Sequence, residues 1–161
     1  MAGVDYFLKL DGIKGESSDA KHKDEIELVS FSWGMSQVGA HTGGAGGGGG
    51  AGKVSFSDVT FVQRTQRSTT ALMQSCASGK HIATGLLTAR KAGKDQMEFL
   101  KIKLTDVLIS SFQIAAESEV PLEAVALNAA KVEVDYSAQD RTGKAVAPSH
   151  FGWDVRVNKA V

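Results

Sequence analysis

The sequence has few of the features that mark several common protein classes. A single cysteine, Cys76, stands among 161 residues, so no disulfide can form within the chain. Eighteen basic residues balance eighteen acidic ones, which argues against a broad basic face for nucleic acid. No apolar run reaches the ~18–20 residues that span a bilayer, and the first residues lack the basic and apolar regions of a signal peptide. We therefore expect a protein made in the cytoplasm, with neither nucleic acid nor a membrane as its partner.

Catalysis also has little support. The histidines His22, His41, His81 and His150 lack the spacing of metal ligands. A nucleophile–base pair of Cys76 with His81 would need the fold to bring the two together, and burial of Cys76 as a small hydrophobe is the simpler interpretation. We predict no enzyme activity, no metal and no cofactor.

A glycine-rich run occupies residues 43–52. It ends in Gly52-Lys53, as a phosphate-binding loop would, but that motif requires Ser or Thr at position 54, where this chain has Val54. The next residues alternate apolar and polar, which indicates a strand rather than the helix that a phosphate loop opens. We interpret residues 38–53 as a long, flexible connection between strands, of a kind that is usually functional or disordered.

Most of the chain has the alternation of β-strands, and its length suggests one domain over residues 1–161. Strands are predicted at 4–10, 26–38, 54–62, 82–90, 97–104, 107–115, 125–128, 132–136 and 151–157. A phase change near Asp106 suggests a bulge. The one predicted helix covers residues 69–77, with Ser68 as its N-cap, Gly79 at its end and an apolar stripe of Leu72, Met73 and Cys76. This content predicts a mainly β fold, a curled and mostly antiparallel sheet or barrel.

Two of these strands carry tryptophan and have one apolar face. In residues 26–38 the apolar face is Val29, Phe31, Trp33 and Met35, and the other face is Ser30, Ser32, Gly34 and Ser36. In residues 151–157 the apolar face is Phe151, Trp153, Val155 and Val157. We expect the apolar faces in the core. The opposite faces either meet solvent or line a wet cavity or tube, and periodicity does not separate these two cases.

Several residue blocks run through the chain in a recognisable order. They are DYFLKLDGIKGES at 5–17, FSWGMSQ at 31–37, the glycine-rich loop into Gly52-Lys53-Val54, SCASGKH at 75–81, RKAG at 90–93, VDY at 134–136 and FGW at 151–153. Together these blocks resemble the hemolysin-coregulated protein (Hcp) family, the tube protein of bacterial type VI secretion systems. The resemblance covers nearly the whole chain.

The resemblance implies a two-sheet β-barrel with one short flanking α-helix, in agreement with the elements predicted above. It implies six-membered rings that stack into a hollow tube, a contractile sheath that propels the tube and a spike protein at its tip. Some members carry small effector proteins in the ring lumen and act as their chaperones. The resemblance also implies that the protein leaves the cell without a signal peptide.

Two surfaces follow from this picture as expectations. We place Ser30, Ser32, Gly34 and Ser36 on the lumen, because small hydroxyl side chains leave a bore open and offer hydrogen bonds to cargo. A closed ring joins two different patches head to tail. We expect the long loop to contact an adjacent subunit or the next ring, through Gln37, Val38, His41, Thr42, Gly47, Gly52 and Lys53.

Two other classes of function stay open at this point. The first is a monomeric or dimeric β-barrel that binds a small ligand between Trp33 and Trp153, and light scattering separates it from a ring. The second is an enzyme that uses Cys76 or the glycine-rich loop, which thiol alkylation and a nucleotide-binding assay would test.

Overall fold

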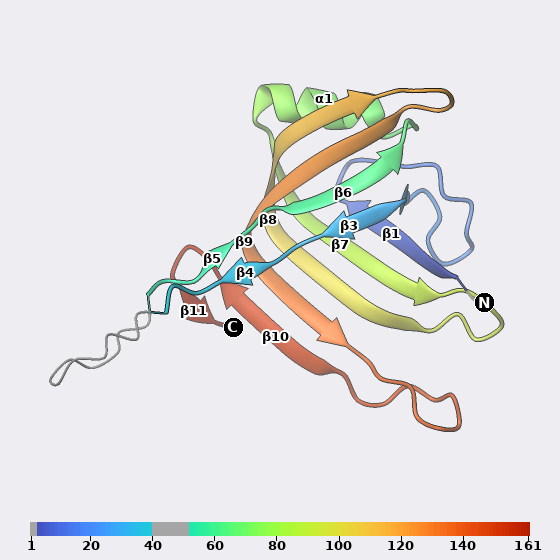
Figure 1. Ribbon diagram of the computed structural model, residues 1–161, viewed down its shortest axis with the longest axis vertical. Helices are drawn as coiled ribbons and strands as arrows, with labels where there is room; N and C mark the ends of the chain where they lie inside the picture. The colour runs from blue at the N-terminus through green and yellow to red at the C-terminus, as the bar shows by residue number, and fades with distance from the viewer. Residues whose placement is uncertain (1–2, 40–51) are drawn as a thin grey trace, which may run out of the picture.

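The computed structural model describes residues 3–39 and 52–161, which form mostly strands. Within these ranges the elements, drawn in Figure 1, are β1 (Val4–Leu10), β2 (Ile26–Leu28), β3 (Ser30–Ser32), β4 (Met35–Ser36), β5 (Ser55–Phe56), β6 (Val59–Arg64), α1 (Thr69–Ser78), β7 (His81–Lys91), β8 (Glu98–Ala115), β9 (Leu122–Tyr136), β10 (Ser149–Asp154) and β11 (Lys159–Ala160). The prediction of a mainly β chain with one short helix is therefore confirmed for the described residues.

The strands form one strongly curled antiparallel sheet and a small ribbon. The order in the sheet is β11-β10-β9-β8-β7-β1-β2, and β6 pairs with the first half of β9. β3 adds to β6, while β4 and β5 form the separate ribbon. β2 and β3 follow one another in the chain but pair with different strands, β1 and β6, so this short segment lies between the two ends of the curl (Figure 1). No continuous ladder closes the described strands into a ring, so the expected two-sheet barrel is open.

The three longest strands change their buried face at the same level. In β8 the buried positions are Ile102 and Leu104 and then Val107 and Ile109, and β7 and β9 change phase opposite this point. Asp106 has φ 54°, a conformation that few non-glycine residues adopt. The register with β9 is the same before and after Asp106, because no extra residue enters one strand there. The predicted bulge is thus displaced: the register shift lies between Ile109 and Ser111.

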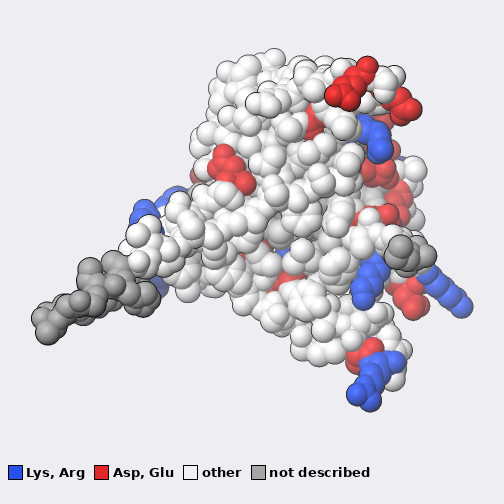
Figure 2. All heavy atoms as spheres, viewed as in Figure 1, with Lys and Arg blue, Asp and Glu red and all other residues white. Residues whose placement is uncertain are grey.

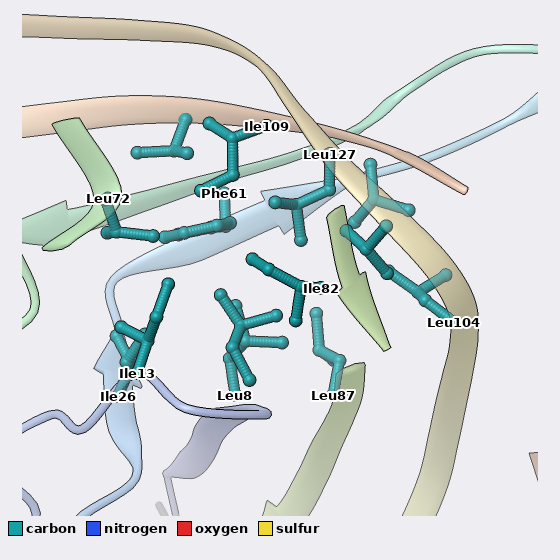
Figure 3. Close-up of a cluster of buried hydrophobic side chains, with 14 of the residues drawn as sticks. Leu8, Ile13, Ile26, Phe61, Leu72, Ile82, Leu87, Leu104, Ile109 and Leu127 are labelled. Atoms are coloured by element: carbon teal, nitrogen blue, oxygen red, sulfur yellow. The ribbon is translucent and has the colours of Figure 1, made fainter. Parts of the chain in front are cut away.

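Buried aliphatic and aromatic side chains from β1, β6, β7, β8, β9 and α1 form one hydrophobic core, part of which is drawn in Figure 3. Phe61 of β6 has an exposed fraction of 0%. Its register partners are Phe31 on β3 and Val125 on β9, so three strands meet around it. Full burial of a side chain of this size stabilises the fold by about 1.5–3 kcal/mol. Phe61 is therefore a central packing residue.

The helix ends as predicted but begins differently. Gly79 takes the left-handed conformation at φ 67°, and its N–H donates to the carbonyl of Ser75. Ser68 is not a side-chain N-cap: it has helical dihedral angles, and its hydroxyl donates to Gln63 Oε1 at 3.1 Å. Instead the hydroxyl of Thr69 accepts the N–H of Gln66 at 3.0 Å. Of the predicted apolar stripe, Leu72 is buried, Cys76 is half-buried and Met73 is exposed.

A buried polar network anchors the start of α1 to the sheet. Glu123 on β9 accepts from Thr69 Oγ1 at 2.8 Å and from Gln63 Nε2 at 3.4 Å. Gln63 also receives the hydroxyl of Ser68, and all four side chains are buried. Buried polar groups of this kind need such partners, because an unpaired one costs about 1–3 kcal/mol. The network therefore fixes where the helix packs on β6 and β9.

The predicted last strand is shorter than expected. β10 ends at Asp154, and residues 155–158 form a turn in which Asn158 has φ 51°. The carboxylate of Asp154 accepts the N–H of Arg156 at 3.0 Å, which closes this turn. Val155 and Val157 are consequently outside the strand, and Val157 is exposed. The chain returns as β11, which pairs with the end of β10.

Candidate functional surface

The segment that was expected to be one strand from 26 to 38 is three short strands with three different partners. β2 pairs with β1, β3 with β6, and β4 with β5. The change of partner occurs at Val29, whose N–H donates to the carbonyl of Val62 at 2.7 Å. A second break occurs at Gly34, whose N–H donates to Ser57 Oγ at 2.9 Å. Apolar and polar residues still alternate across these two breaks, but the segment does not form one continuous strand.

The apolar face of this segment is partly in the core. Phe31 and Trp33 pack against the hydrophobic core, and Phe31 also meets Tyr6 edge to face with ring centroids 5.4 Å apart. Val29 and Met35 are exposed, at 41% and 47%. The prediction of one buried apolar face is therefore right for the two aromatic residues and wrong for the other two. The reason is that Val29 and Met35 lie where the chain leaves one partner strand for another.

The small polar residues lie on the surface. Ser30 and Ser32 are exposed on either side of Phe31 in β3, so they share one face of that strand. Ser36 is exposed on β4, opposite Ser55. Gly34 is half-buried, and its carbonyl accepts from the backbone N–H of Ser57. The structure thus brings Ser30 and Ser32 together, places Ser36 on the ribbon and gives Gly34 a backbone role between them.

The loop residues that the structure describes stand at the outer end of the ribbon, on the left in Figure 1. Gln37, Val38 and Lys53 are exposed, and Val38 reaches 73%. Gly52 lies against Gln37 and Val38, so the two ends of the loop are neighbours. The other predicted contact residues, His41, Thr42 and Gly47, lie outside the described residues.

A charged cluster that the sequence pattern did not reveal joins the segment before β2 to the sheet. Arg90 on β7 donates Nη1 and Nη2 to the two oxygens of Asp19, at 2.9 and 2.7 Å, and Nη2 also to Asp5 at 3.1 Å. The Arg90 side chain is only 3% exposed. Its hydrogen bonds, with the N–H of Lys21, hold the pKa of Asp19 far below its ordinary value, and Asp19 in turn raises the pKa of Arg90.

An aromatic ring links this cluster to a buried histidine. Phe7 lies between the Arg90 guanidinium, 4.9 Å from the ring centroid, and the His22 ring, stacked at 4.2 Å. His22 Nδ1 is 2.7 Å from Glu25 and Nε2 is 2.8 Å from Glu98. Glu25 is therefore largely buried against His22, with 15% of its side chain exposed. Because Asp19 and Arg90 are 71 residues apart in the chain, no local spacing announces the cluster.

The shifted pKa of Asp19 leads to a prediction about acid stability. Since the folded-state pKa lies below the unfolded value near 3.8, Asp19 stabilises the fold above about pH 4, and this contribution is lost as the pH falls further. We expect Asp19→Asn to lower the midpoint of thermal unfolding at pH 7 and to flatten its decline between pH 4 and 2. The exposed Asp95→Asn is the control and should keep the wild-type pH profile. An unchanged profile for Asp19→Asn would contradict the assignment.

The remaining candidates for chemistry have ordinary structural partners. His81 lies 2.6 Å from Asp106 and His150 lies 2.7 Å from Asp135, both at the surface. Within residues 3–39 and 52–161, no group of three His, Cys, Asp or Glu side chains is placed to hold a metal ion. In the same part of the chain, α1 falls short of the length and apolarity that crossing a bilayer requires.

The alternative of a small-ligand barrel would need a pocket lined by both tryptophans, and the structure shows a different lining. Trp33 lines a cavity of about 240 Å³ under the ribbon, but Trp153 is not among the residues around that cavity. Figure 2 shows where charge gathers on this side of the molecule: mainly along the right-hand rim, near the turns that connect the long strands, while the surface around α1 is nearly free of it.

The chain is similar to proteins of one family over nearly its whole length. The family model described as "Type VI secretion system effector, Hcp" matches residues 7–136. The chain is 45% identical over 159 residues to Protein hcp1 of Pseudomonas aeruginosa, covering 96% of this chain and 97% of that protein. The crystal structure of Hcp1 from Salmonella typhimurium has a TM-score of 0.80 at 34% identity, over 100% of both chains. The solved structure of a type six secretion system protein reaches a TM-score of 0.91 at 28% identity, over 99% of this chain and 100% of that one.

Proposed function

This chain belongs to the Hcp family of type VI secretion tube proteins, and from that membership we propose that six copies close into a ring and that the rings stack into a hollow tube. Proteins of this family are secreted structural components that assemble into rings and tubes. The observation that supports the proposal most is the likeness to Protein hcp1, which extends over almost the whole of both chains. The proposal assigns the chain no reaction step and no cofactor.

The strand order suits a head-to-tail ring. The outermost strands, β11 and β2, differ in sequence and surroundings, and a cyclic contact joins two unlike patches. Edge strands carry unpaired backbone N–H and C=O groups, which a neighbouring copy can satisfy. Assembly would therefore cover edges that the isolated subunit leaves open.

The serine face is our candidate for the lumen. Ser30 and Ser32 are exposed on one side of β3, and Phe31 between them packs against the core. Ser36, on the ribbon, adds a further small hydroxyl group. Gly34 lies between Ser32 and Ser36 and has no side chain to fill the bore. Small polar side chains leave a bore open for cargo and offer it both donors and acceptors. We propose that small effector proteins bind this face.

The loop is our candidate for contacts between subunits or between rings. Its described residues stand exposed at the outer end of the ribbon, and they are Gln37, Val38, Gly52 and Lys53. Val38 is an apolar side chain with little cover. The proposal extends to His41, Thr42 and Gly47, which are part of the same loop. Ordering a glycine-rich loop costs about 1–2 kcal/mol per residue in backbone entropy, so a partner surface is needed to offset it.

The wider assembly follows from the family. We propose a spike protein at the tip of the tube, a contractile sheath around it, and export that does not use a signal peptide. The long strands β7, β8 and β9 provide a rigid wall for such a tube, because each is hydrogen-bonded to its neighbours along most of its length.

Electron microscopy of the purified protein tests the function. Rings with a central opening, and stacks of them at higher protein concentration, are the expected result. Light scattering on the same sample gives the mass of the ring. Particles without a perforation at every salt and protein concentration would contradict the proposal, and a monomer or dimer would favour the small-ligand barrel instead.

The lumen assignment has its own test. Ser32→Arg places a long charged side chain on the proposed lumen face and should reduce co-purification of a bound effector about fivefold or more, which corresponds to a loss of about 1 kcal/mol. Rings should still form, because Ser32 is exposed and its side chain is not part of the core. Ser118→Arg, exposed in the β8–β9 turn, is the matched control. Equal effector retention by wild type and Ser32→Arg would place the lumen elsewhere.

A further inference from the structure

The cavity under the β4–β5 ribbon has no role in the function proposed above. It has a volume of about 240 Å³ and is bounded by the ribbon, the start of β6, the middle of β9 and the turn after β10. Its lining combines two aromatic rings with a carboxylate, from Trp33, Phe56 and Asp58. This combination is suited to a positively charged group.

The aromatic wall is built by Trp33 and Phe56. Their rings are nearly parallel, at 11°, with centroids 6.0 Å apart, and both residues are half-buried. Since the two residues come from opposite sides of the glycine-rich loop, the pairing of β4 with β5 brings them together. The face of an aromatic ring, tryptophan above all, attracts a cation.

The carboxylate of Asp58 is held in place by two hydrogen bonds. Oδ2 accepts the hydroxyl of Ser110 at 2.6 Å, and Oδ1 accepts Asn128 Nδ2 at 2.9 Å. Both donors are neutral, so they hold the carboxylate in place without compensating it. No ion pair formed between described residues includes Asp58. Each oxygen has a further lone pair that can accept from an incoming donor.

We propose that this cavity binds the guanidinium group of an arginine from a second copy of the chain, an inference that rests on the proposed stacking of rings. Arginine fits better than lysine, because its planar fork matches a carboxylate and also stacks on aromatic rings. The occupant we assign is Arg141.

Arg141 stands on a preorganised turn far from the cavity. Asp140 accepts at Oδ1 from the N–H groups of Thr142 and Lys144, at 2.8 and 2.9 Å, and from the Thr142 hydroxyl at 2.7 Å. Gly143, at φ 84°, completes the turn. Arg141 is exposed at this tip, and none of the ion pairs within the described ranges includes it. The turn and the ribbon lie at different ends of the molecule (Figure 1), as the two unlike patches of a head-to-tail contact do.

A titration with methylguanidinium tests the cavity on dispersed protein. The indole N–H resonance of Trp33 should shift with saturation in the wild type, and Asp58→Asn should weaken this binding at least about tenfold, since a charge-assisted bond becomes a neutral one. The Asn side chain preserves the shape, and an unchanged unfolding midpoint confirms that the variant is folded. Two results would overturn the cavity assignment. One is the absence of a saturable shift in the wild type, and the other is equal affinity of Asp58→Asn and wild type for methylguanidinium.

Assembly tests the occupant. Arg141→Gln should raise the protein concentration needed for ring stacking about tenfold or more, whereas Lys144→Gln on the same turn should not. If the two groups touch, the double variant Asp58→Asn/Arg141→Gln should stack no worse than either single variant. Stacking by Arg141→Gln at wild-type concentrations, or additive losses in the double variant, would overturn the assignment of Arg141. Absence of rings in the wild type would contradict the proposed function itself, and the titration reports on the cavity separately.

Discussion

Replacement of Phe61 by alanine is expected to lower the free energy of unfolding by about 3–5 kcal/mol. Phe61 is fully buried and lies between β3 and β9, so its removal leaves a cavity that three strands line. A typical domain is stable by only about 5–15 kcal/mol, so this loss would remove a large part of the stability. Denaturant unfolding at one fixed protein concentration measures it, because association also stabilises the folded chain.

The control is Phe99→Ala on β8, which removes the same group from a half-buried position. A clearly smaller loss is expected there, since less apolar surface returns to water. Equal losses in the two variants, or a loss below about 1 kcal/mol for Phe61→Ala, would mean that the core is not centred on β6.

Arg90→Met should cost about 3 kcal/mol, at the lower end for a broken buried ion pair because Asp5 and Asp19 keep access to water. The change leaves the two carboxylates facing one another without their shared cation and removes the guanidinium from the face of Phe7. The segment between β1 and β2 should then detach first. Faster hydrogen exchange at residues 13–25, together with a lower unfolding midpoint, is the expected result.

Two further variants sharpen this test. Arg90→Lys keeps the charge without the fork and should fall between wild type and Arg90→Met. Arg67→Met removes an exposed arginine and should change neither measurement. If residues 13–25 of Arg90→Met exchange no faster than they do in the wild type, the segment is held by its backbone contacts instead.

The elements that were predicted well are those whose pattern is local. β7 matches the strand predicted at 82–90, and Gly79 ends α1 because a left-handed residue is needed there. The strands predicted at 125–128 and 132–136 are instead parts of one longer strand, β9. Even the phase change at Asp106 was visible in the sequence. The expected bulge was not found at Asp106, because the register with β9 shifts only between Ile109 and Ser111, and such a shift depends on the partner strand as well as on β8.

The errors occur where a segment changes its partner. Residues 26–38 alternate as one strand would, but they form β2, β3 and β4, so Val29 and Met35 reach the surface. Residues 151–157 alternate equally well, but Asp154 captures the N–H of Arg156 and turns the chain back. Ser68 is a similar case, because Gln63 and Glu123 offer its hydroxyl and that of Thr69 partners that the helix itself lacks.

The candidate sites show the same contrast between local patterns and contacts of distant residues. The serine pattern of Ser30 and Ser32 is read directly from adjacent residues. The cavity of Trp33 and Asp58 is not, because it needs Ser110 and Asn128, which are 52 and 70 residues from Asp58 in the chain.

From the order of its amino acids alone came the strand-rich composition, the helix with its glycine end, and the kinship with secretion tube proteins. Three-dimensional packing settled the rest: an open curl, the exposure of Val29 and Met35, the Arg90 cluster and the cavity around Asp58. The reason is physical. Side-chain alternation belongs to each strand separately, whereas burial and ion pairing depend on which distant strands lie beside it.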